Sequence, residues 1–223
     1  MNNPEIARLC GQLIQELNKI EDTDELIDCL NDIRSQLHEL SPLKRHPVDC
    51  VLWVKRDDVH ANEWNPNHVA PPEMELLYTS IKCDGYTQPI VTGMHEDNGY
   101  EIVDGFHRYL IPGEHADIMN NTLGYLPVAQ IDRIRSDRMA STIRHNRARG
   151  THEVELMGNI VKELHDLGRS DDWIAKHLGM DADEILRLKQ ITGLAELFAD
   201  KEFSTGEAQH FFALMQTLPS AAQ

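Results

Sequence analysis

The sequence predicts an α+β protein: a mixed-sheet domain, preceded by an N-terminal helical hairpin and followed by a helical region with a helix-turn-helix. Three observations predict this class. Residues 1–46 carry helical apolar spacing, residues 47–138 alternate short apolar strands with helices and turns, and residues 139–223 return to helical spacing. An apolar fraction of 41% over 223 residues is enough for one fair-sized domain or two small ones.

Residues 1–46 are expected to form two amphipathic helices. Leu9, Leu13 and Leu17 fall at helical spacing, and residues 24–40 repeat the pattern. The segment "EDTD" (21–24) supplies the break and an N-cap for the second helix. Two helices this short rarely stand alone, so we expect them to pack on the main domain or on a second copy in a homodimer.

The central part, residues 47–138, is expected to form the sheet. Apolar stretches bounded by turns predict strands at 50–55, 88–94, 100–105 and 126–132. A helix is predicted over 73–85, with Gly85 at its C-terminal end. Residues 106–119 predict a short helix that is interrupted near Pro112 and Gly113.

The C-terminal part, residues 139–223, carries the spacing of a helix-turn-helix. Ala175 precedes Gly179 by four residues, and Ile185 follows six residues later. Asp181 and Glu184 form a capping box that opens the second helix. The alternative is an ordinary helical hairpin. The second helix begins with acidic residues, which disfavours sequence-specific DNA reading by this unit.

Composition narrows the class of protein. The net charge of -16 repels nucleic acid at long range, so DNA binding requires a local basic patch. The four cysteines are widely spaced and predict reduced thiols in a cytosolic protein rather than a disulfide frame or a zinc site. The sequence has no apolar run long enough for a membrane span, and its first residues lack the pattern of a signal peptide.

One basic patch stands out between residues 133 and 149. It contains six arginines and one acidic residue, Asp137, which gives a local charge of +5. Two interpretations stay open: a solvated helix face, or a site that binds an anion such as phosphate. If the segment is helical, Arg144 and Arg147 share a face, and Asn146 and Arg149 share another.

The stretch "YEIVDGFHRYL" (100–110) is the strongest candidate for a binding site. A glycine turn between a strand and a helix exposes backbone N–H groups that can hold an anion. Arg108, just inside the helix, adds a charged fork, and His107 can donate to a phosphate oxygen or orient a water. These residues therefore predict a corner that binds phosphate, although Asp-Gly turns and His-Arg pairs are common on protein surfaces.

The order of motifs over residues 50–195 resembles the ParB/sulfiredoxin superfamily, in particular the ParB N-terminal domain. "GYTQPIV" resembles the Gly-x-x-Gln-Pro-Ile strand entry of that family, "GFHRYLI" its Gly-Glu-Arg-Arg box, and "HNRARG" its Glu-Asn-x-x-Arg box. "HNRARGTHE", the helix-turn-helix and the N-terminal helices most resemble the IbrB (immunoglobulin-binding regulator B) group. Phe106 stands where sulfiredoxin has its catalytic cysteine, so sulfiredoxin chemistry is excluded.

This resemblance implies a pocket for a nucleoside triphosphate, CTP or ATP, with magnesium. The residues implied in nucleotide or phosphate binding are Gln88, Gly105, His107, Arg108, Asn146 and Arg149. Asn146 and Glu153 would face the magnesium ion. The residues that we expect to contact DNA or a protein partner are Arg144, Arg147, Lys176, Arg187 and Lys189.

Three functional hypotheses follow, in order of preference. The first is a nucleotide-regulated DNA-binding protein or transcriptional regulator. The second, implied by the IbrB resemblance, is an accessory partner of an enzyme similar to phosphoadenosine-phosphosulfate reductases. The third is a nucleotide-dependent enzyme, such as a slow nucleoside triphosphatase, a small-molecule kinase or a nuclease.

Overall fold

The computed structural model describes residues 3–62, 64, 71–95, 99–147 and 154–198. The chain forms two compact units, one of residues 1–152 with 177–179 and the other of residues 153–176 with 180–223. No helix in these described ranges is both long enough and apolar enough to cross a membrane.

Two helices open the first unit, as the sequence predicts. Asn3 caps α1 (Pro4–Leu17) by accepting hydrogen bonds from the N–H groups of Glu5 and Ile6, and Asp22 caps α2 (Thr23–Leu40) by accepting from the N–H of Glu25. The predicted N-cap in "EDTD" is therefore confirmed. The apolar face of α1 is exposed along its length, at Ile6, Leu9, Leu13 and Ile14.

Helix α2 covers the open edge of strand β1 (Val51–Lys55). The Asn31 side chain donates to the Trp53 carbonyl at 2.6 Å and accepts from the Trp53 N–H at 3.1 Å. Asn31 thus supplies the two hydrogen bonds that a neighbouring strand would make with an edge strand. Asp24 adds a second tie, because it accepts from Lys55 at 2.6 Å and from the Tyr125 hydroxyl at 2.7 Å.

The sheet is mixed and has the strand order β1-β5-β3-β4-β2. Strands β1 and β5 (Tyr125–Gln130) are antiparallel, β5 and β3 (Ile90–Met94) are parallel, and β3 and β4 (Tyr100–Asp104) are antiparallel. The short strand β2 (Val59–His60), parallel to β4, was not predicted. Two single-turn helices flank β1 and β2, at Pro47–Asp49 and Arg56–Asp58.

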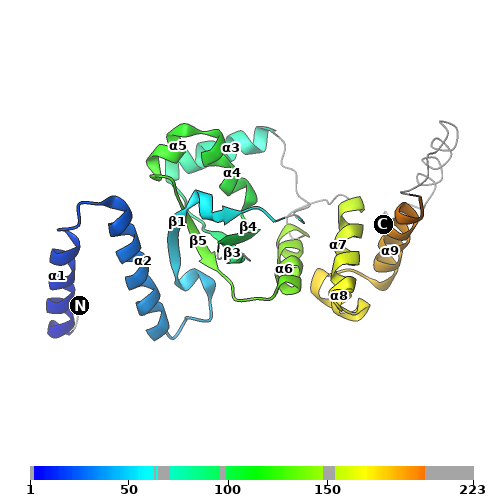
Figure 1. Cartoon of the computed structure of the whole chain (residues 1–223), viewed down its shortest axis with the longest axis horizontal. Coiled ribbons are helices and arrows are strands. Elements are labelled where there is room, and N and C mark those ends of the chain that lie inside the picture. Colours follow the sequence, from blue (N-terminus) through cyan, green and yellow to red (C-terminus); the bar gives the residue numbers. More distant parts are fainter. Residues whose placement is uncertain (1–2, 63, 65–70, 96–98, 148–153, 199–223) are drawn as a thin grey trace. The chain divides into compact units, whose positions relative to one another are not determined.

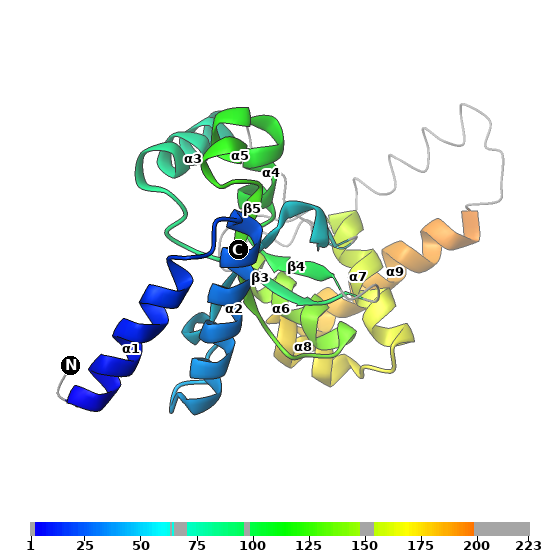
Figure 2. The ribbon, with the colours of Figure 1, turned by 60° about the vertical axis from the view of Figure 1, so that its left-hand side comes forward.

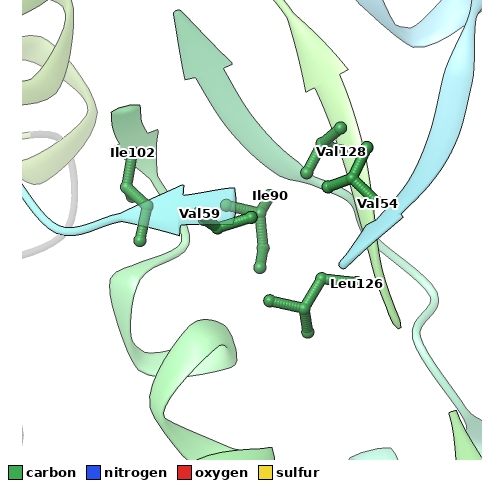
Figure 3. Packing of buried hydrophobic residues seen from close by; sticks show 6 residues of the cluster. All are labelled: Val54, Val59, Ile90, Ile102, Leu126 and Val128. Atoms are coloured by element: carbon green, nitrogen blue, oxygen red, sulfur yellow. The ribbon is translucent and has the colours of Figure 1, made fainter. Parts of the chain in front are cut away.

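Buried aliphatic side chains from all five strands form the core (Figure 3): Val54, Val59, Ile90, Ile102, Leu126 and Val128. Helices α3 (Pro71–Asp84), α4 (Phe106–Glu114) and α5 (Ala116–Asn121) gather on one side of the sheet, and α6 (Arg135–Arg147) lies on the other (Figures 1 and 2). The predicted α+β class is confirmed.

Helix α4 differs from its prediction. The predicted interruption is present but falls slightly later than Pro112 and Gly113, because α4 continues to Glu114 and the break is at His115. Pro112 lies in the last turn, where the missing proline N–H removes only the helical bond to the carbonyl of Arg108. The helix therefore tolerates the proline and ends one turn later.

The second unit contains α7 (Val154–Asp166), most of α8 (Asp171–Leu178) and α9 (Ala182–Phe198). Gly179 ends α8 with a φ of 69°, and the Met180 N–H donates back to the Ala175 carbonyl at 3.1 Å. This left-handed glycine closes the turn of the predicted helix-turn-helix. Asp181 caps α9 by accepting from the Glu184 N–H at 2.7 Å, as the capping pattern predicts.

Candidate functional site

The candidate site is the corner where β4 turns into α4 through Gly105. Gly105 has a φ of +96°, in the left-handed region that favours glycine. A Cβ atom at this position would lie 2.7 Å from Nη2 of Arg108 and 2.9 Å from its Nε. The guanidinium group of Arg108 therefore lies directly against the glycine backbone, and only glycine leaves room for it.

Gln88 and Asp104 hold the Arg108 side chain in this position. Nη1 of Arg108 donates to Oε1 of Gln88 at 2.6 Å, and Nη2 lies 3.4 Å from Oδ2 of Asp104. Strand β3 runs antiparallel to β4 with Val91 opposite Asp104, so residues just before β3 lie beside residues just after β4. This register explains why Gln88 contacts Arg108. It brings together three of the predicted site residues, Gln88, Gly105 and Arg108.

The corner also contains groups that the sequence did not single out. The Asp104 side chain is 8% exposed and that of Arg108 is 14% exposed, so this ion pair is largely shielded from water. Tyr86 donates its hydroxyl to the carbonyl of Arg108 at 2.8 Å. Burial raises the pKa of the Tyr86 hydroxyl, and the hydroxyl therefore stays a neutral donor.

His107 is half-buried on the first turn of α4. Its ring meets the Phe106 ring edge-on, with the centroids 5.7 Å apart and the planes at 67°. No side chain caps the N-terminus of α4 in the described part of the chain, since the capping position is Gly105. The first-turn N–H groups of α4 thus form a positive helix end at the corner.

Helix α6 packs against β4. Arg138 pairs with Glu101, at the start of β4, at 2.8 Å. One turn later, the Thr142 hydroxyl accepts from the Trp64 indole at 3.4 Å, and Trp64 follows Asn62, whose amide donates to the Ile102 carbonyl. These contacts hold α6 against β4 and against the segment that contains Asn62 and Trp64.

Two of the six clustered arginines have structural roles. The side chains of Arg138 and Glu101 are only 11% and 8% exposed, and the Arg138 side chain packs on Gly93, where a Cβ would overlap it. The guanidinium of Arg135 lies 4.4 Å from the centre of the Trp64 ring. The cluster is therefore not one uniform surface patch, because these two arginines hold α6 against the sheet and against Trp64.

The second predicted box falls partly outside the described residues. Asn146 and Arg147 lie in the last turn of α6, but their side chains are outside the description, and Arg149 and Glu153 lie in the undescribed range 148–153. Arg144 is exposed on α6. Within the described ranges no group of three or more metal-ligating side chains is found, so the magnesium ligands predicted at Asn146 and Glu153 stay a prediction.

The predicted basic contacts of the second unit differ in their surroundings. Lys176 on α8 and Arg187 on α9 are exposed. Nζ of Lys189 lies 2.5 Å from Oδ1 of Asp171, so an ion pair already holds this lysine. Asp183 and Glu184 make the first turn of α9 acidic.

Comparisons with known proteins give a family match for the C-terminal domain and a relative that is similar over most of the chain. Residues 152–200 match the family model of the IbrB-like C-terminal HTH domain. The chain is 51% identical over 197 residues to the uncharacterized protein YbdM of Escherichia coli K12, covering 88% of this chain and 94% of YbdM. The predicted IbrB resemblance is thereby confirmed for the helix-turn-helix region.

Two crystal structures of C-terminally truncated ParB, the chromosome-partitioning protein of Caulobacter crescentus, are also similar. The complex with CTP-γ-S is 19% identical with a TM-score of 0.38, covering 73% of this chain and 92% of that one. The complex with the centromeric parS site is 18% identical with a TM-score of 0.42, covering 63% and 71%. On the identity and coverage of the YbdM match, the chain belongs to the family of Escherichia coli YbdM and has an IbrB-like C-terminal HTH domain.

Proposed function

We propose that the corner at Gly105 binds the phosphates of a nucleoside triphosphate, CTP or ATP, and that this binding regulates a DNA-binding protein. The observation that carries the proposal is the guanidinium of Arg108, which lies on a left-handed glycine at the N-terminal end of α4. A planar charged fork beside a positive helix end is a recurrent way to bind phosphate. Gln88 fixes one side of the fork at 2.6 Å, so little side-chain freedom remains to be lost on binding.

Asp104 sets a condition on the ligand. Its largely buried carboxylate lies beside the place where a phosphate would meet Arg108, and two negative charges at this distance repel each other. A magnesium ion on the nucleotide would neutralise phosphate charge at this point, so the corner fits a magnesium-bound triphosphate better than a free anion. Asn146, in the last turn of α6, is the residue that we propose to face the ion.

The test is thermal unfolding with CTP and ATP, each with and without magnesium. A nucleotide that binds the native state raises the melting temperature. Arg108→Ala should lower nucleotide affinity by about tenfold or more, because a charge-assisted hydrogen bond contributes about 1.5–3 kcal/mol. Arg8→Ala, on the exposed face of α1, removes the same charge elsewhere and should leave affinity unchanged. Equal affinity of folded Arg108→Ala and the native protein would refute the site.

The IbrB-like HTH domain supports the regulator hypothesis, and the charges of α9 favour a second candidate. The acidic first turn of α9 and the pairing of Lys189 with Asp171 leave few positive charges for DNA phosphates. These features suit an accessory role beside a protein partner, such as the enzyme similar to phosphoadenosine-phosphosulfate reductases.

The candidates separate by direct assays. A regulator should bind a DNA fragment with a steep dependence on salt. A partner module should co-purify with the reductase-like enzyme and bind no DNA alone. A nucleotide-dependent enzyme should hydrolyse the triphosphate, transfer a labelled γ-phosphate to a small acceptor, or cut DNA.

A further inference from the structure

A cavity of about 340 Å³ lies between α2 and the body of the first unit, and it shares Tyr86 with the Gly105 corner. Apolar side chains from several elements line it, among them Leu30 on α2, Trp53 on β1 and Ile118 on α5. Small-molecule sites have volumes of roughly 300–1,000 Å³, and this cavity falls within that range.

The cavity exists because α2 is held to the sheet by polar ties rather than by close packing. Asn31 and Asp24 fix the helix against β1, as described above, but none of the α2 residues is fully buried. Leu30 and Ile27 are half-buried and face the open volume. An apolar wall of this kind is only partly removed from water, so an apolar ligand would complete its burial.

One cationic side chain lines this apolar cavity. Arg34, one turn after Leu30 on α2, is half-buried, and its Nη1 donates to Oδ1 of Asn31 at 3.0 Å. Because Asn31 is itself bound to the backbone of Trp53, this contact fixes one edge of the guanidinium. No carboxylate of the described residues pairs with Arg34, so the group has a neutral partner and keeps its charge uncompensated.

We propose that this cavity binds a small apolar carboxylate, with the carboxylate on the fork of Arg34 and the apolar part against Leu30, Trp53 and Ile118. Arginine and carboxylate form paired, parallel hydrogen bonds, and this match of charge and shape favours a carboxylate over a neutral molecule. A water molecule occupies about 30 Å³ of liquid, so the cavity has room for roughly ten non-hydrogen atoms. The proposal concerns a second site and does not depend on nucleotide binding at the corner.

Octanoate is a suitable probe, and 1-octanol is its uncharged control. Calorimetric titration of the full chain should show saturable binding of octanoate and much weaker binding of octanol. Arg34→Gln should weaken octanoate binding by roughly tenfold and leave octanol binding unchanged, because only the charged contact is lost. Arg45→Gln, which removes one exposed charge from the linker after α2, is the matched control and should bind octanoate like the native chain.

Leu30→Trp fills the cavity without changing a charge, and it keeps the test independent of Arg34. This variant, shown to be folded by circular dichroism, should lose octanoate binding. The proposal is overturned if octanoate does not bind, or if Arg34→Gln and Arg45→Gln weaken binding equally. Octanoate binding to folded Leu30→Trp with native affinity would also overturn it.

Discussion

The hydroxyl of Tyr86 donates to the carbonyl of Arg108 at 2.8 Å, in the place of a helical N–H that Pro112 lacks. In a regular helix the carbonyl of residue 108 accepts from the N–H of residue 112. Pro112 cannot donate, and it is buried, so water does not replace the missing bond. Tyr86 thus satisfies the backbone of the residue whose side chain lies at the proposed phosphate corner.

Replacing Tyr86 by Phe should therefore destabilise the protein by about 1–3 kcal/mol, since a largely buried carbonyl loses its donor. Pro112→Ala restores the N–H that can donate to the carbonyl of Arg108. In the Pro112→Ala background, Tyr86→Phe should therefore lower the free energy of unfolding by less than half as much. Urea unfolding of the native chain, the two single variants and the double variant measures the coupling. Equal costs in both backgrounds would show that Tyr86 acts only through its ring.

Gly105→Ala should destabilise the protein and also displace Arg108. A residue with a side chain costs roughly 1–2 kcal/mol in the left-handed conformation, and the new Cβ would in addition lie 2.7 Å from Nη2 of Arg108. Gly124→Ala is a matched control, because Gly124 has a φ of +80° and nothing within 4 Å of the added Cβ.

The difference between these two alanine variants isolates the contact with Arg108. Thermal unfolding should show a larger loss for Gly105→Ala than for Gly124→Ala, and only the former should lose nucleotide-induced stabilisation. If both variants bind nucleotide equally, the guanidinium is not confined by the glycine.

Local sequence patterns predicted most of this fold. Apolar periodicity located α1, α2 and four of the five strands, and glycines marked the ends of α3 and α8. The two-residue strand β2 escaped prediction because it is too short for any period to be read. It exists only because β4 offers a parallel partner.

The sequence indicated the corner at Gly105 and Arg108, but it did not predict the ion pair between Arg108 and Asp104. A glycine turn followed by an arginine indicated the corner, but the proximity of Asp104 to Arg108 depends on the left-handed turn between them. Arg138 looked like one of six surface arginines, and its partner Glu101 lies 37 residues away in the sequence. Contacts of this range follow from the sheet and helix placement and leave no local pattern.

Helix α2 should be necessary for a stable first unit, whereas α1 should not. Deletion of residues 1–20 removes a helix with no buried residue and should leave the melting temperature nearly unchanged. Deletion of residues 1–46 also removes Asn31 and Asp24, which exposes the edge of β1 and should cause unfolding or aggregation. A soluble 47–223 fragment with native stability would contradict this. Light scattering of the variant that lacks residues 1–20 tests the predicted homodimer, because this variant loses the exposed apolar face of α1 and keeps α2.

Acidification should loosen α2 through Asp24. The Lys55 ammonium group, and then the Tyr125 hydroxyl, hold the pKa of Asp24 below its ordinary value. A carboxylate whose pKa is lowered by folding stabilises the native state above its unfolded pKa of about 4, and this contribution is lost as the pH falls through the lower folded value. Asp24→Asn should therefore be less stable than the native chain at neutral pH, and the gap should close in acid.

Glu25→Gln is the control for the pH experiment. Glu25 shares the first turn of α2 with Asp24, so both carboxylates lie near the positive end of that helix. Only Asp24 is bonded to Lys55 and Tyr125. Urea unfolding at neutral and acidic pH should show a larger pH-dependent gap for Asp24→Asn, and equal gaps would assign the effect to the helix end.

DNA binding, if the regulator hypothesis holds, should depend more on the arginines of α6 than on Lys189 of α9. Arg144 is exposed and donates to a neutral acceptor, the carbonyl of His177, at 3.2 Å, whereas Lys189 is already paired with the carboxylate of Asp171. Changing Arg144 and Arg147 together to Ala should weaken binding to a DNA fragment and lower the salt slope by roughly two, about one per lost phosphate contact. Lys189→Ala should change the slope little.

The same double variant separates the DNA contact from the nucleotide site. Arg149 is predicted to face the nucleotide with Asn146, so Arg149→Ala should abolish nucleotide binding while the Arg144 and Arg147 double variant retains it. If the double variant loses nucleotide and Arg149→Ala does not, the two faces are assigned the wrong way round. If the native chain binds no DNA even at low salt, where electrostatic attraction is strongest, the regulator hypothesis fails and the partner module takes its place.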